Sequence, residues 1–175
     1  IVIVMAGTEH CAREYSAYLP GKYVHVGFRE DIISKYWDHC NVLRTQGKEP
    51  PKCLLICDDI MVTRSSKKHN VTRTSDNYWL NRVYAEGRHQ NMSVVLSVPS
   101  LAVGLPFVRC ADAFICFPSA VHAYQDIKMI TENYVPMGNR KAAEALLDHF
   151  IQYEALVVEY FRQASRRWQT RIKWY

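Results

Sequence analysis

Two adjacent acids stand at the end of an apolar run in this sequence, in the segment 53–59, which reads C-L-L-I-C-D-D. A continuous apolar run of this length is typical of a strand buried on both faces of a parallel sheet. Ligands bind at the carboxyl ends of such strands. There, Asp58 could hold Mg²⁺ beside nucleotide phosphates and Asp59 could polarise the attacking water, as in a Walker B motif. The other interpretation is a solvated acidic turn, and the motif alone does not decide between them.

A nucleotide enzyme of this class also needs a phosphate-binding loop, with the pattern G-x-x-x-x-G-K-[ST]. Gly-Lys occurs twice, at Gly21-Lys22 and Gly47-Lys48, and neither place has the first glycine or the following serine or threonine. The chain opens at Ile1, already inside an apolar run. We therefore expect a truncated sequence, whose first strand and phosphate loop precede Ile1.

Two arginines stand just before other apolar runs. Arg88 lies in the segment 87–96, G-R-H-Q-N-M-S-V-V-L, and Arg109 in the segment 105–117, L-P-F-V-R-C-A-D-A-F-I-C-F. An arginine can reach phosphate oxygens in its own site or in that of a neighbouring subunit. We expect both side chains at the nucleotide end of the sheet. Each is also compatible with a surface arginine or one paired with a carboxylate.

Apolar runs and helical stretches alternate along the chain. The apolar runs are Ile1–Met5, Cys53–Cys57, Met92–Val98, Ala113–Phe117 and Ala155–Val158. The helical stretches are 9–18, 30–43, 75–86, 119–133 and 138–153. Strands that alternate with helices predict an α/β fold, with a mostly parallel sheet sandwiched by helices.

The tail of the chain has a different pattern. Residues 156–161 and 170–174 are rich in β-formers and flank the polar segment 162–169, which predicts a C-terminal β-hairpin. Basic and aromatic residues interleave there, a composition that can bind nucleic acid. Charge that protects the edge of a hairpin accounts for the same residues.

Composition narrows the class of protein. The 175 residues are 49% hydrophobic and 22% charged, which fits one globular domain over 1–175. The net charge of +5 is compatible with a nucleic-acid partner without demanding one. The six cysteines form no C-x-x-C pair, so we expect reduced thiols in an intracellular protein and no structural metal. The longest uncharged run, 91–108, is broken by two prolines and a glycine, so we expect no membrane span.

These motifs, in this order, resemble the DNA-packaging ATPases of large double-stranded DNA viruses, of the poxvirus and iridovirus type within the FtsK–HerA superfamily. The resemblance covers nearly the whole chain. It rests on the strand Ile1–Met5, the Asp58-Asp59 pair, the segment 87–96, the segment 105–109 and the ending 172–175.

The resemblance implies a RecA-like P-loop NTPase core and a single ATPase domain whose P-loop is missing from this chain. It implies ATP-driven translocation of double-stranded DNA into a capsid, with ATP and Mg²⁺ as cofactors. The implied partners are DNA, the capsid or its portal vertex, and further copies of the chain in a homo-oligomeric ring. The implied location is the viral assembly site in an infected cell, or the virion. Without the P-loop, we expect no ATP hydrolysis by the chain as printed.

The resemblance also assigns roles to residues. Asp58 would bind Mg²⁺ and the nucleotide, and Asp59 would orient the attacking water. Arg88 and Arg109 would stabilise charge in the transition state, in their own subunit or in a neighbour's. Ser97 would contact the nucleotide.

One departure from the family's pattern bears on activity. Pro99 stands where the family usually has a polar sensor, typically glutamine, and a proline side chain donates no hydrogen bond. Either Ser97 or Ser100 takes over this role, or hydrolysis is impaired. Two alternatives therefore stay open: a cellular FtsK/HerA-like pump for DNA or protein, and a non-catalytic homologue that binds nucleic acid. The basic stretch 64–73 is a candidate DNA-contacting loop, or a solvated one.

Overall fold

The computed structural model describes residues 1–60, 78–98, 113–116, 154–162 and 168–174, and eight single residues between 127 and 148. The chain divides into two compact units, one holding strands β1 to β4 and the other strands β5 to β7. Each is described by itself. The single domain expected over 1–175 stays a prediction.

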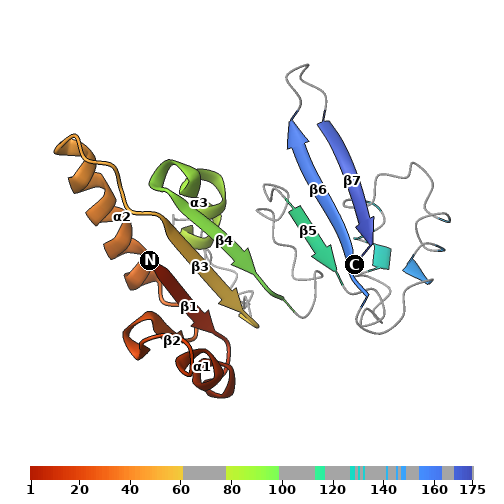
Figure 1. Ribbon diagram of the computed structural model, residues 1–175, viewed down its shortest axis with the longest axis horizontal. Coiled ribbons are helices and arrows are strands. Elements are labelled where there is room, and N and C mark those ends of the chain that lie inside the picture. Colours follow the sequence, from red (N-terminus) through yellow and green to blue (C-terminus); the bar gives the residue numbers. More distant parts are fainter. Residues whose placement is uncertain are drawn as a thin grey trace, which may run out of the picture. The chain divides into compact units, whose positions relative to one another are not determined.

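A four-stranded parallel sheet forms the first unit (Figure 1). Its strands are β1 (Val2–Ala6), β2 (Val24–Val26), β3 (Cys53–Asp58) and β4 (Met92–Leu96), in the order β2-β1-β3-β4. The two apolar runs at the centre, β1 and β3, supply its most buried side chains, including Val4, Met5 and Leu55. The prediction of a parallel α/β fold is confirmed. The short strand β2 was not predicted.

Helices cover both faces of this sheet. They are α1 (Glu9–Ser16), α2 (Glu30–Thr45) and α3 (Tyr78–Glu86), with single 3₁₀ turns at η1 (Gly21–Tyr23) and η2 (Gly87–Gln90). Alternate residues of β3 point to opposite faces. One face is buried: Cys53, Leu55 and Cys57. The other is partly exposed: Leu54, Ile56 and Asp58.

The buried face packs against α2 and α3. Helix α2 buries Ile33, Tyr36, Trp37 and Cys40, which repeat at the spacing of one helical face. The rings of Trp37 and Trp79 meet edge to face at 5.8 Å and join α2 to α3. The Arg82 guanidinium lies over both rings, at 4.7 and 5.3 Å from their centres. Helix α1 lies on the other face, where Tyr15 reaches Asp58.

The second unit is a three-stranded antiparallel sheet of β5 (Ala113–Cys116), β6 (Leu156–Arg162) and β7 (Trp168–Trp174). Strands β6 and β7 form the predicted C-terminal hairpin, with each strand slightly longer than predicted. Strand β5 pairs antiparallel with β6. Its apolar sequence predicted a buried strand but carried no information on direction. That prediction fails at Ile115, whose side chain is 58% exposed. Among the described residues, no helix is long and apolar enough to cross a membrane.

Candidate functional site

The carboxyl ends of β1, β3 and β4 meet at one edge of the parallel sheet, which we call the carboxyl edge. Ala6 pairs with Asp58, and Cys57 pairs with Leu96. The backbone N–H of Gly7 donates to the Asp58 carbonyl, and that of Ser97 donates to the Cys57 carbonyl, both at 2.8 Å. The structure therefore brings Asp58, Asp59 and Ser97 together, as the sequence predicted for residues of a nucleotide site.

The acid pair sits in a tight turn against the end of β1. Asp59 has a φ of 50°, in the left-handed region. A Cβ atom on Gly7 would lie 1.9 Å from the Asp59 carbonyl oxygen, so only glycine allows this approach. This glycine fixes where the acid pair leaves the sheet. Sequence reasoning missed it, because a lone glycine after a strand carries no distinctive signal.

Tyr15 of α1 is the second residue that sequence reasoning missed. Its hydroxyl donates to Asp58 Oδ2 at 3.2 Å. Burial raises the pKa of Tyr15, and the negative charge of Asp58 raises it further. The two residues are 43 positions apart in the sequence, so no local spacing could have revealed the contact.

Arg88 lies at the opposite edge, which we call the amino edge. It belongs to η2, which precedes β4, and the first residue of β4, Met92, pairs with Cys53 at the start of β3. The length of β3 then separates Arg88 from the acid pair by roughly 16 Å along the strands. The expectation that Arg88 lies at the nucleotide end of its own sheet is wrong, because residues that precede a parallel strand lie at its amino end. Its side chain is exposed and forms no ion pair with the described residues.

Several predicted site residues lie outside the described residues. They are Arg109, Pro99, Ser100 and the basic stretch 64–73. Their roles stay predictions.

Several polar groups of the amino edge are bound within the chain. Gln90 is an exception: its Nε2 donates to Asn41 Oδ1 at 3.2 Å, but its buried Oε1 has no hydrogen-bond partner among the described residues. The Tyr36 hydroxyl lies 2.7 Å from the Pro51 carbonyl and 3.0 Å from the Gln90 carbonyl, and donates to them. The Asn91 side chain donates to the Pro50 carbonyl at 2.9 Å and to Glu49 Oε1 at 3.1 Å. These hydrogen bonds hold together the segments that lead into β3 and β4.

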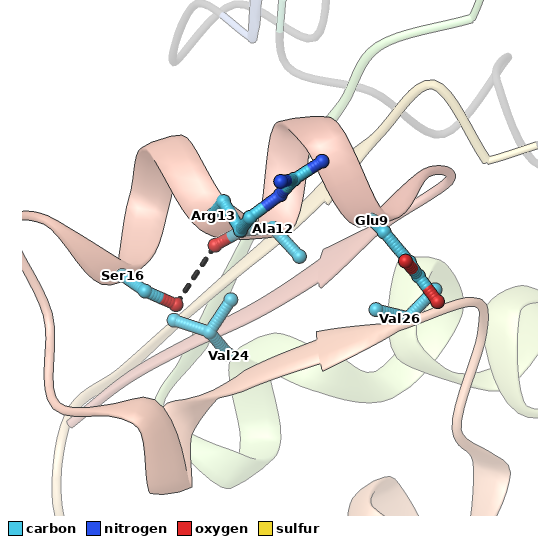
Figure 2. A pocket seen from close by; sticks show the side chains of 6 residues that line it. All are labelled: Glu9, Ala12, Arg13, Ser16, Val24 and Val26. Carbon is cyan, nitrogen blue, oxygen red and sulfur yellow. Dashed lines mark hydrogen bonds between the residues drawn. The ribbon is translucent and has the colours of Figure 1, made fainter.

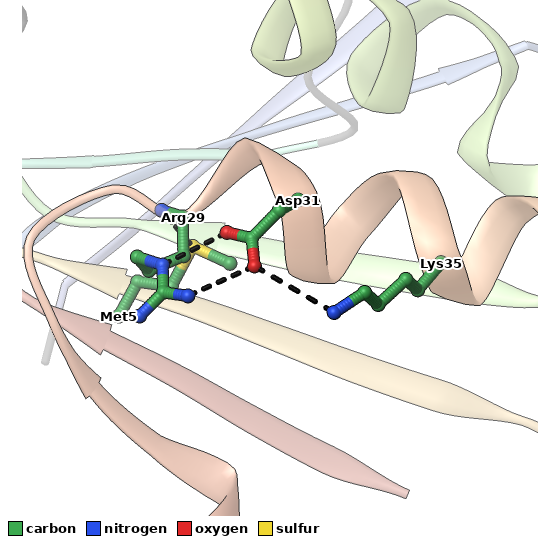
Figure 3. Close-up of polar contacts among 4 residues, drawn as sticks. All are labelled: Met5, Arg29, Asp31 and Lys35. Carbon is green, nitrogen blue, oxygen red and sulfur yellow. Dashed lines mark hydrogen bonds and ion pairs between the residues drawn. The ribbon is translucent and has the colours of Figure 1, made fainter.

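Arg29, at the carboxyl edge, is bound to a carboxylate within the chain (Figure 3). It follows β2, and its guanidinium holds both oxygens of Asp31 at 2.8 Å. Lys35 lies 3.9 Å from the same carboxylate, and the Arg29 backbone N–H donates to Met5 Sδ. The hydrogen bond from Arg29 lowers the pKa of Asp31, which stands in the first turn of α2. Asp31 places a negative charge in the first turn of α2, where such a charge is favourable, although no side chain forms a capping hydrogen bond there.

A shallow depression of about 390 Å³ lies between α1 and β2 (Figure 2). Its lining residues are Glu9, Ala12, Arg13, Ser16, Val24 and Val26. Ser16 donates to the Ala12 carbonyl at 2.8 Å, so its hydroxyl is already used. The depression includes neither acid of the pair, and we do not assign the nucleotide to it.

The side chains at the carboxyl edge fit Mg²⁺ bound together with phosphates. Asp58, Asp59 and Ser97 offer oxygen atoms only, which this hard cation prefers. Among the described residues, no group of three or more His, Cys, Asp or Glu side chains could hold a metal ion. A protein-only metal cage is therefore not found in that part of the chain. Two carboxylates that share the ion with phosphates and water are typical of Mg²⁺ in nucleotide enzymes.

A solved structure similar to this chain is that of the genome-packaging NTPase B204 from Sulfolobus turreted icosahedral virus 2, in complex with the ATP analogue AMPPCP. The TM-score is 0.56 and the sequences are 17% identical, over 97% of this chain and 81% of that chain. No protein-family model and no curated protein matches the sequence. At this identity the likeness shows the fold, an α/β core of the kind found in a viral packaging NTPase. The poxvirus and iridovirus type is a finer assignment and belongs to the proposal below.

Proposed function

We propose that this protein is a viral genome-packaging ATPase, which couples ATP hydrolysis to the translocation of double-stranded DNA into a capsid. The observation that carries the proposal is the acid pair at the carboxyl edge of a parallel sheet. The likeness in fold to a packaging NTPase that binds an ATP analogue supports it. The ordered motifs favour the poxvirus and iridovirus type within the FtsK–HerA superfamily.

In this proposal the two acids have separate roles. Asp58 holds Mg²⁺, directly or through water, and Mg²⁺ when bound neutralises charge on the phosphates. Asp59 orients the attacking water. Ser97, at the end of β4, contacts the nucleotide from the neighbouring strand.

No segment of the printed 175 residues matches the pattern of a phosphate-binding loop, so in this proposal such a loop is still to be supplied. Within the described residues, β4 pairs only with β3. The first unit therefore has a strand edge at which a further strand, carrying the loop, can pair.

Arg88 and Arg109 are proposed as charge-stabilising residues of a homo-oligomeric ring. Arg88 lies at the edge opposite its own acid pair, so it would serve a neighbour's nucleotide. The test mixes wild-type subunits with Arg88→Ala subunits, and separately with Arg109→Ala subunits. An arginine acting in trans can be worth roughly 10³–10⁵ in turnover. The activity of the mixture should therefore fall by more than the fraction of variant subunits that it contains. Activity that falls only in proportion to the wild-type fraction, for both variants, would remove the assignment.

A second candidate function is a non-catalytic homologue that binds nucleic acid, which Pro99 in the sensor position favours. One experiment separates the two. The complete encoded protein is assayed for Mg²⁺-dependent ATP hydrolysis with and without double-stranded DNA. Hydrolysis that DNA stimulates and Asp59→Asn abolishes supports the packaging ATPase. DNA binding without hydrolysis supports the non-catalytic homologue.

A further inference from the structure

Tyr15 occupies an unusual place for a tyrosine on a short polar helix. Helix α1 begins at the carboxyl end of β1, where Thr8 caps it by accepting the Cys11 N–H at 3.2 Å. Ala12 is buried against the sheet, and Tyr15 stands one turn further on, half-buried. The helix thus crosses the face of the sheet on which Asp58 lies.

The Tyr15 hydroxyl contacts one oxygen of Asp58 and leaves the other free. It donates to Oδ2 at 3.2 Å, and among the described residues Oδ1 has no partner. A carboxylate accepts about four hydrogen bonds or ligands in all, so one donor leaves the other lone pairs of Asp58 available. The contact restricts the rotation of the carboxylate while leaving most of its lone pairs available.

We infer that Tyr15 is a positioning residue for Asp58, which holds the carboxylate in the orientation needed to bind Mg²⁺ with the nucleotide. This inference rests on the proposed function of the acid pair. Mg²⁺ demands near-ideal octahedral geometry, so the direction of each ligand oxygen matters. Residues that orient a metal ligand by hydrogen bonding commonly change metal affinity without touching the metal.

The competing explanation is that Tyr15 only fastens α1 to the sheet. Such a fastening would contribute to the melting temperature and would not depend on Mg²⁺. A positioning residue acts on the step at which Mg²⁺ joins the nucleotide. The two explanations therefore differ in the ratio of nucleotide affinities with and without Mg²⁺.

The experiment measures AMPPCP binding to the complete encoded protein by calorimetry, with Mg²⁺ and with a chelator. We compare wild type, Tyr15→Phe, Asp58→Ala and the double variant. Tyr18→Phe is the matched control, because Tyr18 lies just beyond the same helix and is 87% exposed. Thermal melting of each variant reports whether α1 stays in place.

For Tyr15→Phe, we expect the Mg²⁺-dependent gain in AMPPCP affinity to fall by about tenfold, which is the low end of the range for residues that orient metal ligands. We choose the low end because 3.2 Å is long for a hydrogen bond from a tyrosine hydroxyl to a carboxylate. Metal-free affinity and Tyr18→Phe should match wild type, and Tyr15→Phe should add nothing to Asp58→Ala. A Tyr15→Phe protein that melts lower but keeps the full Mg²⁺-dependent gain would overturn the inference alone. A wild-type protein without Mg²⁺-dependent binding would overturn the proposed function and this inference with it.

Discussion

At the amino edge of the four-stranded sheet, Tyr36 and Asn91 are bound by hydrogen bonds within the chain, whereas at the carboxyl edge the acid pair and Ser97 have almost no partners. Tyr36 lies between two carbonyl oxygens, and Asn91 joins a carbonyl and a carboxylate. At the other edge, Asp58 has a single partner, Tyr15. The side chains of Asp59 and Ser97 have none among the described residues.

This difference separates polar groups that stabilise the fold from groups that remain available to a ligand. Buried carbonyls without a donor are costly, and Tyr36 supplies a donor to those of Pro51 and Gln90. Partly exposed carboxylates can stay solvated until a ligand arrives. We therefore expect substitutions of Tyr36 and Asn91 to lower stability and leave activity unchanged. Substitutions of Asp58 and Asp59 should lower activity and leave stability nearly unchanged.

The largest effect is expected for the acid pair in the complete protein. Asp59→Asn should lower ATP turnover by about 10²-fold or more, because the residue acts on the attacking water in the transition state. AMPPCP affinity should be nearly unchanged, whereas Asp58→Ala should weaken Mg²⁺-dependent binding. Steady-state kinetics and calorimetry separate the two. Equal loss of nucleotide binding in both variants would contradict the assigned roles.

Gly7→Ala should displace the turn that holds the acid pair at the carboxyl edge. The new Cβ would overlap the Asp59 carbonyl oxygen, so the turn must move, at a cost of about 3 kcal/mol in unfolding free energy. Gly21→Ala is the matched control, since nothing lies within 4 Å of its Cβ position, and it should be neutral or slightly stabilising. Urea denaturation measures both. Equal stability of the two variants would show that Gly7 does not constrain the acid pair.

Tyr36→Phe tests the amino edge. It removes the donor shared by the Pro51 and Gln90 carbonyls, which should cost about 2 kcal/mol of unfolding free energy. Turnover per folded molecule should not change. Tyr18→Phe, at an exposed tyrosine, should alter neither quantity. A Tyr36→Phe protein that is fully stable but slower would reverse the roles assigned to the two edges.

The smallest expected effect is on the pH dependence of stability, and it tests whether water reaches the buried thiol of Cys57. Cys57 precedes Asp58 and is fully buried, and burial raises the pKa of its thiol to about 12. The unfolded chain loses this proton first as pH rises, so stability is complete below the ordinary thiol pKa and falls above it. Between about pH 8.5 and 9.5, Cys57 should account for a loss of about 1 kcal/mol. Cys57→Ala should remove that part of the slope in urea denaturation; an unchanged slope would mean that water reaches Cys57.

The sequence allowed prediction of the features that local pattern determines. The apolar run before Asp58 predicted a buried strand with the acids at its carboxyl end, and the helical spacing of Ile33, Trp37 and Cys40 predicted α2. Both depend on neighbours in the chain. The strand β2 is only three residues long, too short to give a pattern.

The contacts that position the acid pair could not be predicted in this way. Tyr15 meets Asp58 only because α1 packs back against β1 and β2, and Gly7 is required only because β1 ends against Asp59. The place of Arg88 could have been predicted, since the residues before a parallel strand always lie at its amino edge.

The central claim is that nucleotide binds at the carboxyl edge of the sheet. Hydrogen exchange of the complete protein, with and without Mg²⁺ and AMPPCP, tests it most directly. We expect slower exchange in peptides that contain residues 7–8, 58–60 and 97–98, and unchanged exchange in peptides that contain 49–53. Protection confined to the amino-edge peptides, or nucleotide binding without protection around Asp58, would contradict the claim.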